Sequence, residues 1–271
     1  MKPLEQGAAH RPIIEWPRHT GSGQVDVIAE EMPVALIYNG LSQAVMMASP
    51  VNLDAFGLGF SLTEGIIDDP EQLYGIDVTL GEASAEIALD IATRQFERLK
   101  QMRRTLTGRS GCGLCGKESL DQIRRVMPPV SGPFTLTHNA IQRATTNLAH
   151  HQPLQGLTGA VHGAAWCRLD GSIMRVCEDV GRHNALDKLI GSLWGENCLQ
   201  GPGFLLMSSR ASYEIVQKAA KAGIAVVATL SAPTSMAIDL AAAAGMTLIG
   251  FARESRHLAY CHAHRLTDEV F

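Results

Sequence analysis

The sequence predicts an α/β protein with a small N-terminal α+β lobe and a C-terminal lobe built from βαβ units. The second half carries the clearest evidence, because apolar runs of strand length alternate there with helical segments. Two of these helical segments are followed by a glycine, Gly223 and Gly245, which is the usual left-handed cap of a helix. The composition, 46% hydrophobic and 18% charged, is typical of a globular chain with a sizeable core.

The N-terminal lobe is expected at residues 25–104, after a flexible tail at residues 1–24, where prolines and glycines stand without periodicity. An acidic turn joins its first two strands, and Asn39-Gly40 is a hairpin turn into the third. A helix is expected to follow Pro50. The expected strands lie at residues 25–29, 34–38, 43–48, 74–80 and 85–91, and the helix at about 52–64.

A glycine-rich segment with a C-x-x-C pair, Cys112 and Cys115, is expected to form a mobile loop between the lobes. Residues 105–133 comprise this loop, a short helix from near Lys117 and a linker rich in proline. Arg109 and Lys117 flank the pair, and nearby cations favour the reactive thiolate. The pair is therefore the first candidate for sulfur chemistry or metal binding.

Three interpretations of the pair remain open from the residues alone. A structural zinc site needs four ligands, and Cys261, His262 and His264 lack the usual spacing for the other two. A thioredoxin-like centre places its pair at a helix start directly after a strand, which a long glycine-rich loop fits poorly. The third interpretation is sulfur carriage, in which a cysteine thiolate accepts sulfur as a persulfide. Cys167 and Cys177 are expected to be small buried hydrophobes.

The C-terminal lobe, residues 134–271, is expected to place a ligand site at one edge of its sheet. Its regular elements are a strand at 204–208, a helix at 212–222, a strand at 224–230, a helix at 234–244 and a strand at 246–251. Ligands of parallel sheets lie beyond the carboxyl ends of the strands, which here are residues 208–210, 231–234 and 251–256. Their hydroxyls and arginines suit a phosphorylated ligand. Alternatively, Ser212 and Thr234 only cap helices.

A second cluster, at residues 178–188, has a glycine that introduces a helix carrying Arg182 and His183. His183 is either an acid–base group, a phosphate contact or a hydrogen-bonded structural residue, and His162 leaves the same alternatives open. The P-loop motif G-x-x-x-x-G-K-[ST] is absent, and the one G-x-G-x-x-G, at Gly111–Gly116, is the segment of the C-x-x-C pair itself.

Charge and hydropathy exclude several classes of partner. The formal net charge of -4 gives no reason to expect nucleic acid. The N-terminus has no apolar run of a secretory signal, and the longest apolar stretch, at 237–252, is too short and too interrupted to span a bilayer. We therefore expect a cytoplasmic protein with no membrane or nucleic-acid partner, whose cysteines are mostly free thiols.

From about residue 25 to the C-terminus, the chain resembles the FdhD/NarQ family, the accessory sulfurtransferases of formate dehydrogenases. The resemblance is carried by a set of segments that is far more specific together than the C-x-x-C alone. These segments are DVIAEEMPVALIYNG, GFSLTEGII, RSGCGLCG, LTGAVHGAAW, EDVGRHNALDKLIG, SSRASYEIVQKAAKAGI and SAPTSMAIDLA.

The resemblance implies a sulfur carrier. Such a protein takes persulfide sulfur from a cysteine desulfurase of the IscS type and passes it to the molybdenum cofactor, Mo-bis(molybdopterin guanine dinucleotide) or bis-MGD, which formate dehydrogenase requires. It also implies that Cys112 carries the persulfide, with Cys115 in an auxiliary role. The catalytic subunit of formate dehydrogenase is an implied partner, and the chain is expected to form a homodimer. We expect no metal site in the protein itself. The residues implied to bind the cofactor are Phe251, Ala252, Arg253, Glu254, Ser255 and Arg256. The alternative is a chaperone that binds the cofactor without transferring sulfur.

The family's second half also resembles the cytidine deaminase fold. Deaminases of that fold need an H-x-E motif for catalysis, together with a P-C-x-x-C zinc motif. Here His162 is followed by Gly163 and Ala164, so the catalytic glutamate is missing. The sequence therefore excludes deamination.

Overall fold

Two large cores organise the chain in the computed structural model, which describes residues 6–14, 24–106, 129–130, 132, 134–195 and 201–268. One core belongs to a four-stranded sheet in the first half, and the other to a six-stranded sheet in the second half. The chain is thus a mixed α/β protein, as predicted. The boundaries expected at residues 25–104 and 134–271 stay a prediction, and most of the segment expected at 105–133 lies outside the described residues.

The first sheet has the strand order β4-β3-β6-β5 and carries helix α1 on one face. Asn39 and Gly40 join β3 to β4 with positive φ angles of 45° and 81°, the conformation of a tight hairpin turn. The predicted strands, helix and turn of this half are confirmed, whereas α2 was not foreseen. The elements are β3 (Met32–Tyr38), β4 (Leu41–Ala48), α1 (Leu53–Thr63), a 3-10 turn (Pro70–Gln72), β5 (Leu73–Leu80), β6 (Ala85–Ile91) and α2 (Thr93–Leu106).

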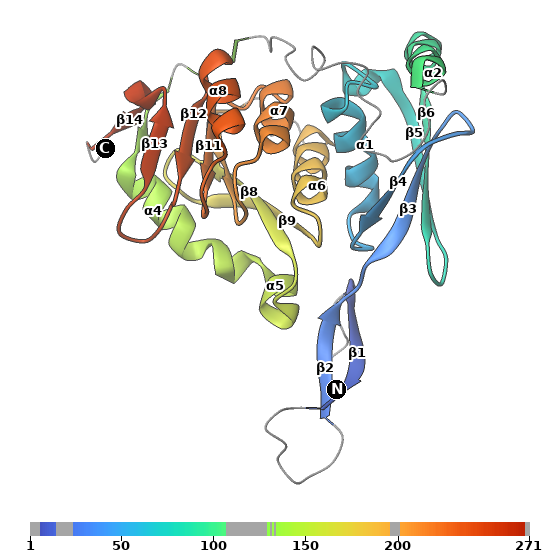
Figure 1. Ribbon diagram of the computed structural model, residues 1–271, viewed down its shortest axis with the longest axis horizontal. Coiled ribbons are helices and arrows are strands. Elements are labelled where there is room, and N and C mark those ends of the chain that lie inside the picture. Colours follow the sequence, from blue (N-terminus) through green and yellow to red (C-terminus); the bar gives the residue numbers. More distant parts are fainter. Residues whose placement is uncertain are drawn as a thin grey trace.

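A separate two-stranded ribbon precedes this sheet. Strand β1 (Ala8–Ile13) pairs antiparallel with β2 (Gln24–Ala29), and Figure 1 shows the ribbon extending away from both sheets. The prediction of a loose tail is therefore wrong for residues 8–13. Most side chains of β1 are exposed, so no hydrophobic alternation marks the strand, and main-chain pairing over a distance in sequence forms it. Strands β2 and β3, although consecutive, belong to different sheets.

The second sheet has the order β13-β12-β11-β10-β8-β9. Its strands β10, β11 and β12 are parallel, and both predicted glycine caps are confirmed, since Gly223 and Gly245 have φ angles of 75° and 71°. The flanking strands β8, β9 and β13 are antiparallel, which the sequence pattern did not reveal. The strands are β8 (His162–Arg168), β9 (Ile173–Asp179), β10 (Gly203–Met207), β11 (Val226–Thr229), β12 (Thr247–Gly250) and β13 (Leu258–Cys261).

Helices surround this sheet and connect it to the first half (Figure 1). A short parallel bridge, β7 (Leu136–Thr137) with β14 (Leu266–Thr267), brings the end of the chain beside the start of α4. The helices are α4 (His138–Asn147), α5 (Pro153–Thr158), α6 (Arg182–Gly195), α7 (Tyr213–Lys221) and α8 (Ser235–Ala243), with 3-10 turns at Leu148–His151 and Ala263–Arg265. No helix in the described ranges is both long and apolar enough to cross a membrane.

Helices α1 and α6 cross with their backbones in direct contact. A Cβ atom added at Gly59 would lie 1.8 Å from the carbonyl oxygen of Asp187, and one added at Gly191 would lie 1.9 Å from that of Ala55. Any side chain at these two positions would force the helices apart. The two glycines therefore let the halves of the chain approach closely.

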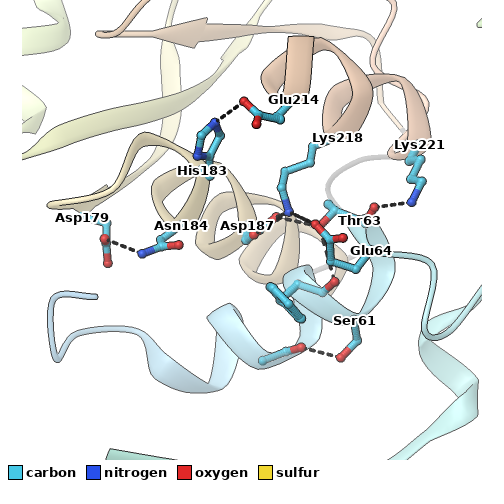
Figure 2. A network of polar contacts seen from close by, with 12 residues as sticks. Ser61, Thr63, Glu64, Asp179, His183, Asn184, Asp187, Glu214, Lys218 and Lys221 are labelled. Atoms are coloured by element: carbon cyan, nitrogen blue, oxygen red, sulfur yellow. Dashed lines mark hydrogen bonds and ion pairs between the residues drawn. The ribbon is translucent and has the colours of Figure 1, made fainter. Parts of the chain in front are cut away.

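A buried set of ion pairs, which we call the seam, completes the junction between the halves. Lys218 on α7 donates to Asp187 on α6 at 2.9 Å and to Thr63 at the end of α1 at 2.9 Å (Figure 2). Lys188 on α6 donates to Asp179 at 2.5 Å and to the carbonyl oxygen of Ser49 at 2.9 Å. The four charged side chains of these pairs are at most 7% exposed.

The charge state of the seam follows from this pairing. Burial alone would lower the pKa of Lys218, but the carboxylates of Asp187 and Glu64 outweigh it and raise that pKa. The ammonium group is therefore charged at neutral pH, as its partners require. The seam fixes the start of α6 relative to the first sheet, and so positions the residues that α6 presents at the sheet edge.

Candidate functional site

The carboxyl ends of the three parallel strands meet at one edge of the six-stranded sheet, which we call the carboxyl edge. The N–H of Ser231, after β11, donates to the carbonyl oxygen of Ser209, after β10, at 3.4 Å. The N–H of Phe251, after β12, donates in turn to the carbonyl oxygen of Ser231 at 3.2 Å. The structure thus brings together the three segments that the sequence placed at strand ends.

The segment 251–256 is anchored at its start and exposed beyond it. Phe251 has a φ angle of 50°, and the N–H of the buried Ala252 donates to the carbonyl oxygen of Thr229 at 3.0 Å. A hydrogen bond of 2.9 Å from the N–H of Arg253 to the carbonyl oxygen of Arg256 closes a turn. The four residues from Arg253 to Arg256 are exposed. The turn therefore presents two guanidinium groups to solvent on a fixed backbone, which suits an anionic ligand.

Helix α4 supports this segment from the side. The side chain of Gln142 donates to the carbonyl oxygen of Glu254. The Nδ1 atoms of His138 and His257 lie 3.2 Å apart, so one ring donates to the other. Burial, followed by the nearby His138, lowers the pKa of His257. Sequence reasoning missed these supports, because residues 138–142 and 254–257 are far apart in the chain.

Because β8 runs antiparallel to β10, its first residue lies at the same edge. The N–H of Ser208 donates to the carbonyl oxygen of Gly163 at 2.9 Å, and the N–H of Gly163 donates to the Oγ of Ser208 at 2.8 Å. His162, the neighbour of Gly163, pairs across the sheet with Asp179 of β9. The structure therefore adds His162 to the carboxyl edge.

The start of α6 lies beside His162. The Oδ1 atom of Asp179 accepts the N–H of Gly181 at 2.7 Å and the side-chain amide of Asn184 at 3.0 Å, which fixes the turn into the helix. The predicted helix after Gly181 is confirmed as α6. Arg182 and His183 are its first residues, and each is partly exposed.

His183 reaches across to helix α7. Its Nε2 atom lies 3.1 Å from the carboxylate of Glu214 (Figure 2). The same atom lies 3.5 Å from the Oγ of Ser212. Burial and then the positive charge of Arg182 lower the pKa of His183, although Glu214 opposes the change. Burial and Arg182 lower the pKa of His162 as well. Both rings are therefore mostly neutral at pH 7 and provide one donor and one acceptor each.

The hydroxyls at the two helix starts have different roles. The Oγ1 of Thr234 accepts the N–H of Ala237 at 3.3 Å, so Thr234 caps α8 as one of the alternatives predicted. Ser212 makes no such side-chain cap on α7, and its hydroxyl instead lies beside His183 and Glu214. Ser212 therefore belongs to the carboxyl edge.

The described cysteines are poor nucleophiles. Cys167 and Cys177 are buried, as predicted, and Cys261 is partly exposed. Burial raises the pKa of each of these three thiols, so they are protonated at neutral pH. Cys112 and Cys115 lie outside the described residues, and their assignment stays a prediction.

The residues of the zinc alternative have other partners. The thiol of Cys261 donates to the carbonyl oxygen of Met246 at 3.2 Å, and Nε2 of His262 lies 2.9 Å from that of Ala242. In the ranges that the structure covers, no three histidine, cysteine, aspartate or glutamate side chains gather in a way that would hold a metal ion.

The chain is similar in sequence to one protein family over most of its length. The sequence profile of the FdhD/NarQ family matches residues 29–267. A sulfur carrier protein FdhD from Acinetobacter baylyi is 49% identical over 87% of this chain and 86% of its own length. One from Cupriavidus necator is 48% identical over 100% of this chain and 96% of its own length.

A solved structure has the same fold. The crystal structure of a protein described as a formate dehydrogenase accessory protein, from Desulfotalea psychrophila, superposes with a TM-score of 0.73. The match covers 96% of this chain and 98% of that one, at 23% sequence identity.

Proposed function

The chain belongs to the FdhD/NarQ family, and we propose from this membership that it is a sulfur carrier serving formate dehydrogenase. The observation that carries the proposal is the identity of 45–49% to three relatives named as sulfur carriers, over at least 87% of this chain. At such identity the two cores and the carboxyl edge are expected to be shared.

Cys112 is the proposed carrier of the sulfur. Its thiolate attacks the outer sulfur of a persulfide on a cysteine desulfurase of the IscS type. A new S–S bond forms on Cys112, the S–S bond of the donor breaks, and the donor cysteine leaves as a thiolate. No external oxidant or reductant is needed, because one disulfide-type bond replaces another. Cys115 assists the transfer or shields the persulfide.

The acceptor in this proposal is the molybdenum cofactor, bis-MGD, which the protein binds as a substrate. The residues proposed to hold it are 251–256, together with the hydroxyls of 231–234. Their geometry fits a ligand with several phosphates, because the exposed guanidinium groups of Arg253 and Arg256 stand on an anchored turn. The S–S bond of the Cys112 persulfide breaks, the substrate supplies the electron pair of the new bond to the outer sulfur, and Cys112 leaves as a thiolate.

Low reactivity of the described cysteines supports sulfur carriage at the C-x-x-C pair. Burial disfavours the thiolate at Cys167, Cys177 and Cys261, so none of them is a suitable carrier. A homodimer in the cytoplasm, with the catalytic subunit of formate dehydrogenase as client, completes the proposal. The likeness of the second half to the cytidine deaminase fold stays a prediction and has no role in the reaction.

Intact-protein mass spectrometry tests the proposal. The purified protein is incubated with a cysteine desulfurase and cysteine, and a gain of about 32 Da, one sulfur atom, is expected. The gain should persist in Cys115→Ala and in the control Cys261→Ala, and disappear in Cys112→Ala. A gain that survives in Cys112→Ala would reject the carrier assignment. No gain on any form would favour a chaperone that binds the cofactor without transferring sulfur.

A further inference from the structure

Arg182 occupies an unusual place at the carboxyl edge. It is the first residue of α6, where the positive end of the helix dipole disfavours a cation. Its Nε atom is fully buried without a hydrogen-bond partner among the described residues. An unpaired cation at this end of a helix costs stability, so another interaction must explain its position.

The nearby carboxylates are all paired with other groups. Asp179 is bound by Lys188 at 2.5 Å and by the N–H of Gly181 at 2.7 Å. The carboxylate of Glu214 lies 3.1 Å from Nε2 of His183. Asp187 is bound by Lys218 at 2.9 Å. In the part of the chain that the structure describes, no ion pair is therefore available to Arg182.

Two histidines and a hydroxyl accompany this guanidinium. His162 lies at the start of β8, beside the turn that Asp179 fixes, and His183 follows Arg182 on α6. The positive charge of Arg182 is close enough to His162 and His183 to lower the pKa of both imidazoles. Ser212 adds its hydroxyl 3.5 Å from Nε2 of His183. Ser212 and His183 both donate to Glu214, at 3.3 Å and 3.1 Å. The cluster therefore offers the guanidinium of Arg182, the imidazole of His162 and, once it is protonated, Nδ1 of His183.

We propose that Arg182, His162 and His183 form an anion pocket that binds a phosphate group of the ligand held at the carboxyl edge. An arginine guanidinium beside imidazole donors matches the oxygens of a phosphate. The phosphate takes the position opposite Arg182 that no carboxylate of the described chain occupies. This pocket rests on the proposed function for the identity of its ligand, because the phosphate is taken to belong to the guanine dinucleotide cofactor.

The position of the pocket supports a shared ligand. Strands β8 and β12 are separated by three strand spacings, so His162 and Phe251 stand roughly 14 Å apart along the edge. The Ser208–Ser209 segment and the 231–234 segment lie between them. A ligand as long as a dinucleotide extends from the arginines of 251–256 to Arg182, with phosphate groups against both.

Calorimetry on the full chain tests the pocket with three probes: inorganic pyrophosphate, GDP and guanosine. Pyrophosphate and GDP should bind the wild type, and Arg182→Gln should weaken both by about 10-fold to 100-fold, as expected for one lost charge-assisted contact. Arg182→Lys should restore part of the loss. The control Arg168→Gln, which is exposed at the opposite end of β8, should bind like the wild type. Guanosine binding should be the same in all variants.

A second readout excludes a merely structural role. Bound phosphate should raise the pKa of His162 and His183, which is followed by NMR of the histidine rings with and without pyrophosphate. The signals are assigned with His162→Asn and His183→Asn, and the rings outside the pocket should not respond. Arg182→Gln should abolish the response while its thermal unfolding stays like that of the wild type.

Either of two results would overturn the pocket: no binding of pyrophosphate to the wild type, or equal binding to Arg182→Gln. Binding of pyrophosphate without GDP would keep the anion pocket but separate it from the nucleotide. The experiment does not involve Cys112, so sulfur carriage and the pocket can each fail alone.

Discussion

The seam between the two halves and the carboxyl edge are both rich in charged side chains, but they differ in how the charges are paired. In the seam, Lys188 and Lys218 are each at most 7% exposed and each bonded to a buried aspartate. At the edge, Arg182, Arg253 and Arg256 form no ion pair within the described residues, and the last two are exposed.

The difference separates groups that act on the fold from groups that act on a ligand. A buried ion pair tolerates no loss of either partner, because the remaining charge would be stranded in a low-dielectric interior. An exposed or unpaired arginine contributes little to stability, but it is free to bind an anion. Substitutions in the seam should therefore change unfolding, and substitutions at the edge should change binding.

The largest effect is expected from the seam. Asp179→Ala should lower the free energy of unfolding by about 3–5 kcal/mol, because Lys188 would remain buried without its carboxylate. Urea unfolding followed by circular dichroism measures this change. Asp68→Ala, which breaks an exposed pair with Arg98, is the matched control and should cost less than about 1 kcal/mol. Equal losses in the two variants would contradict a structural role of the seam.

Substitutions at the carboxyl edge should weaken ligand binding without changing the free energy of unfolding. Arg256→Ala should weaken GDP binding by about 1.5–3 kcal/mol, the value of one charge-assisted contact, and leave urea unfolding unchanged. Arg94→Ala, an exposed arginine of α2, should change neither quantity. Unchanged affinity in Arg256→Ala, measured by calorimetry, would remove this residue from the site.

Helix packing at the seam gives a smaller effect. Gly191→Ala places a Cβ atom 1.9 Å from the carbonyl oxygen of Ala55, so α1 and α6 must separate, at a cost of about 1–3 kcal/mol. Gly195→Ala in the same helix meets no atom within 4 Å and should leave stability unchanged or slightly higher. Thermal unfolding compares the two, and a Gly191→Ala protein as stable as Gly195→Ala would refute the close crossing.

The smallest effect concerns pH. Burial and Arg182 lower the pKa of folded His162, so the unfolded chain takes up a proton that the folded chain does not as pH falls below about 6.5. Stability is therefore lost as pH falls through this value, and His162→Asn should flatten that part of the curve. A steeper dependence of the free energy of unfolding on pH in His162→Asn would contradict a lowered pKa of His162 in the folded protein.

The same contrast explains how much could be predicted from the sequence. The parallel strands, their helices and the caps at Gly223 and Gly245 follow local patterns, and these predictions are confirmed. Strand β1 and the pairing of β8 with β10 depend on residues that are distant in sequence, so local reasoning missed them, and it also missed β9 and β13.

For the site, local reasoning found the strand ends but not what surrounds them. Residues 251–256 were predicted as a strand end and again from the family resemblance, and the structure places them at the predicted edge. The grouping of His162 with Arg182 depends on the register of β8 with β9, and Gln142 reaches Glu254 across 112 residues. The role of Cys112 and Cys115 rests on the sequence alone, because both lie outside the described residues.

One rival location for a ligand lies between the start of α4 and the turn from β8 to β9. A pocket of about 680 Å³ beside the start of α4 is lined by Phe134, Asn139, Arg143 and Asp170, among others. Its arginine is paired with Asp170 at 3.5 Å, in contrast to the unpaired arginines of the carboxyl edge. Charge pairing thus favours the edge over this pocket.

Hydrogen–deuterium exchange with and without GDP tests the division between seam and carboxyl edge, because it reports on both regions and on the rival pocket in a single experiment. With GDP, slower exchange is expected in peptides that cover residues 181–184, 208–212, 231–234 and 251–256. Peptides of the seam, at residues 47–64, should be well protected in both states and unchanged by GDP. Protection confined to residues 134–143 and 169–171, or none at the carboxyl edge, would contradict this division.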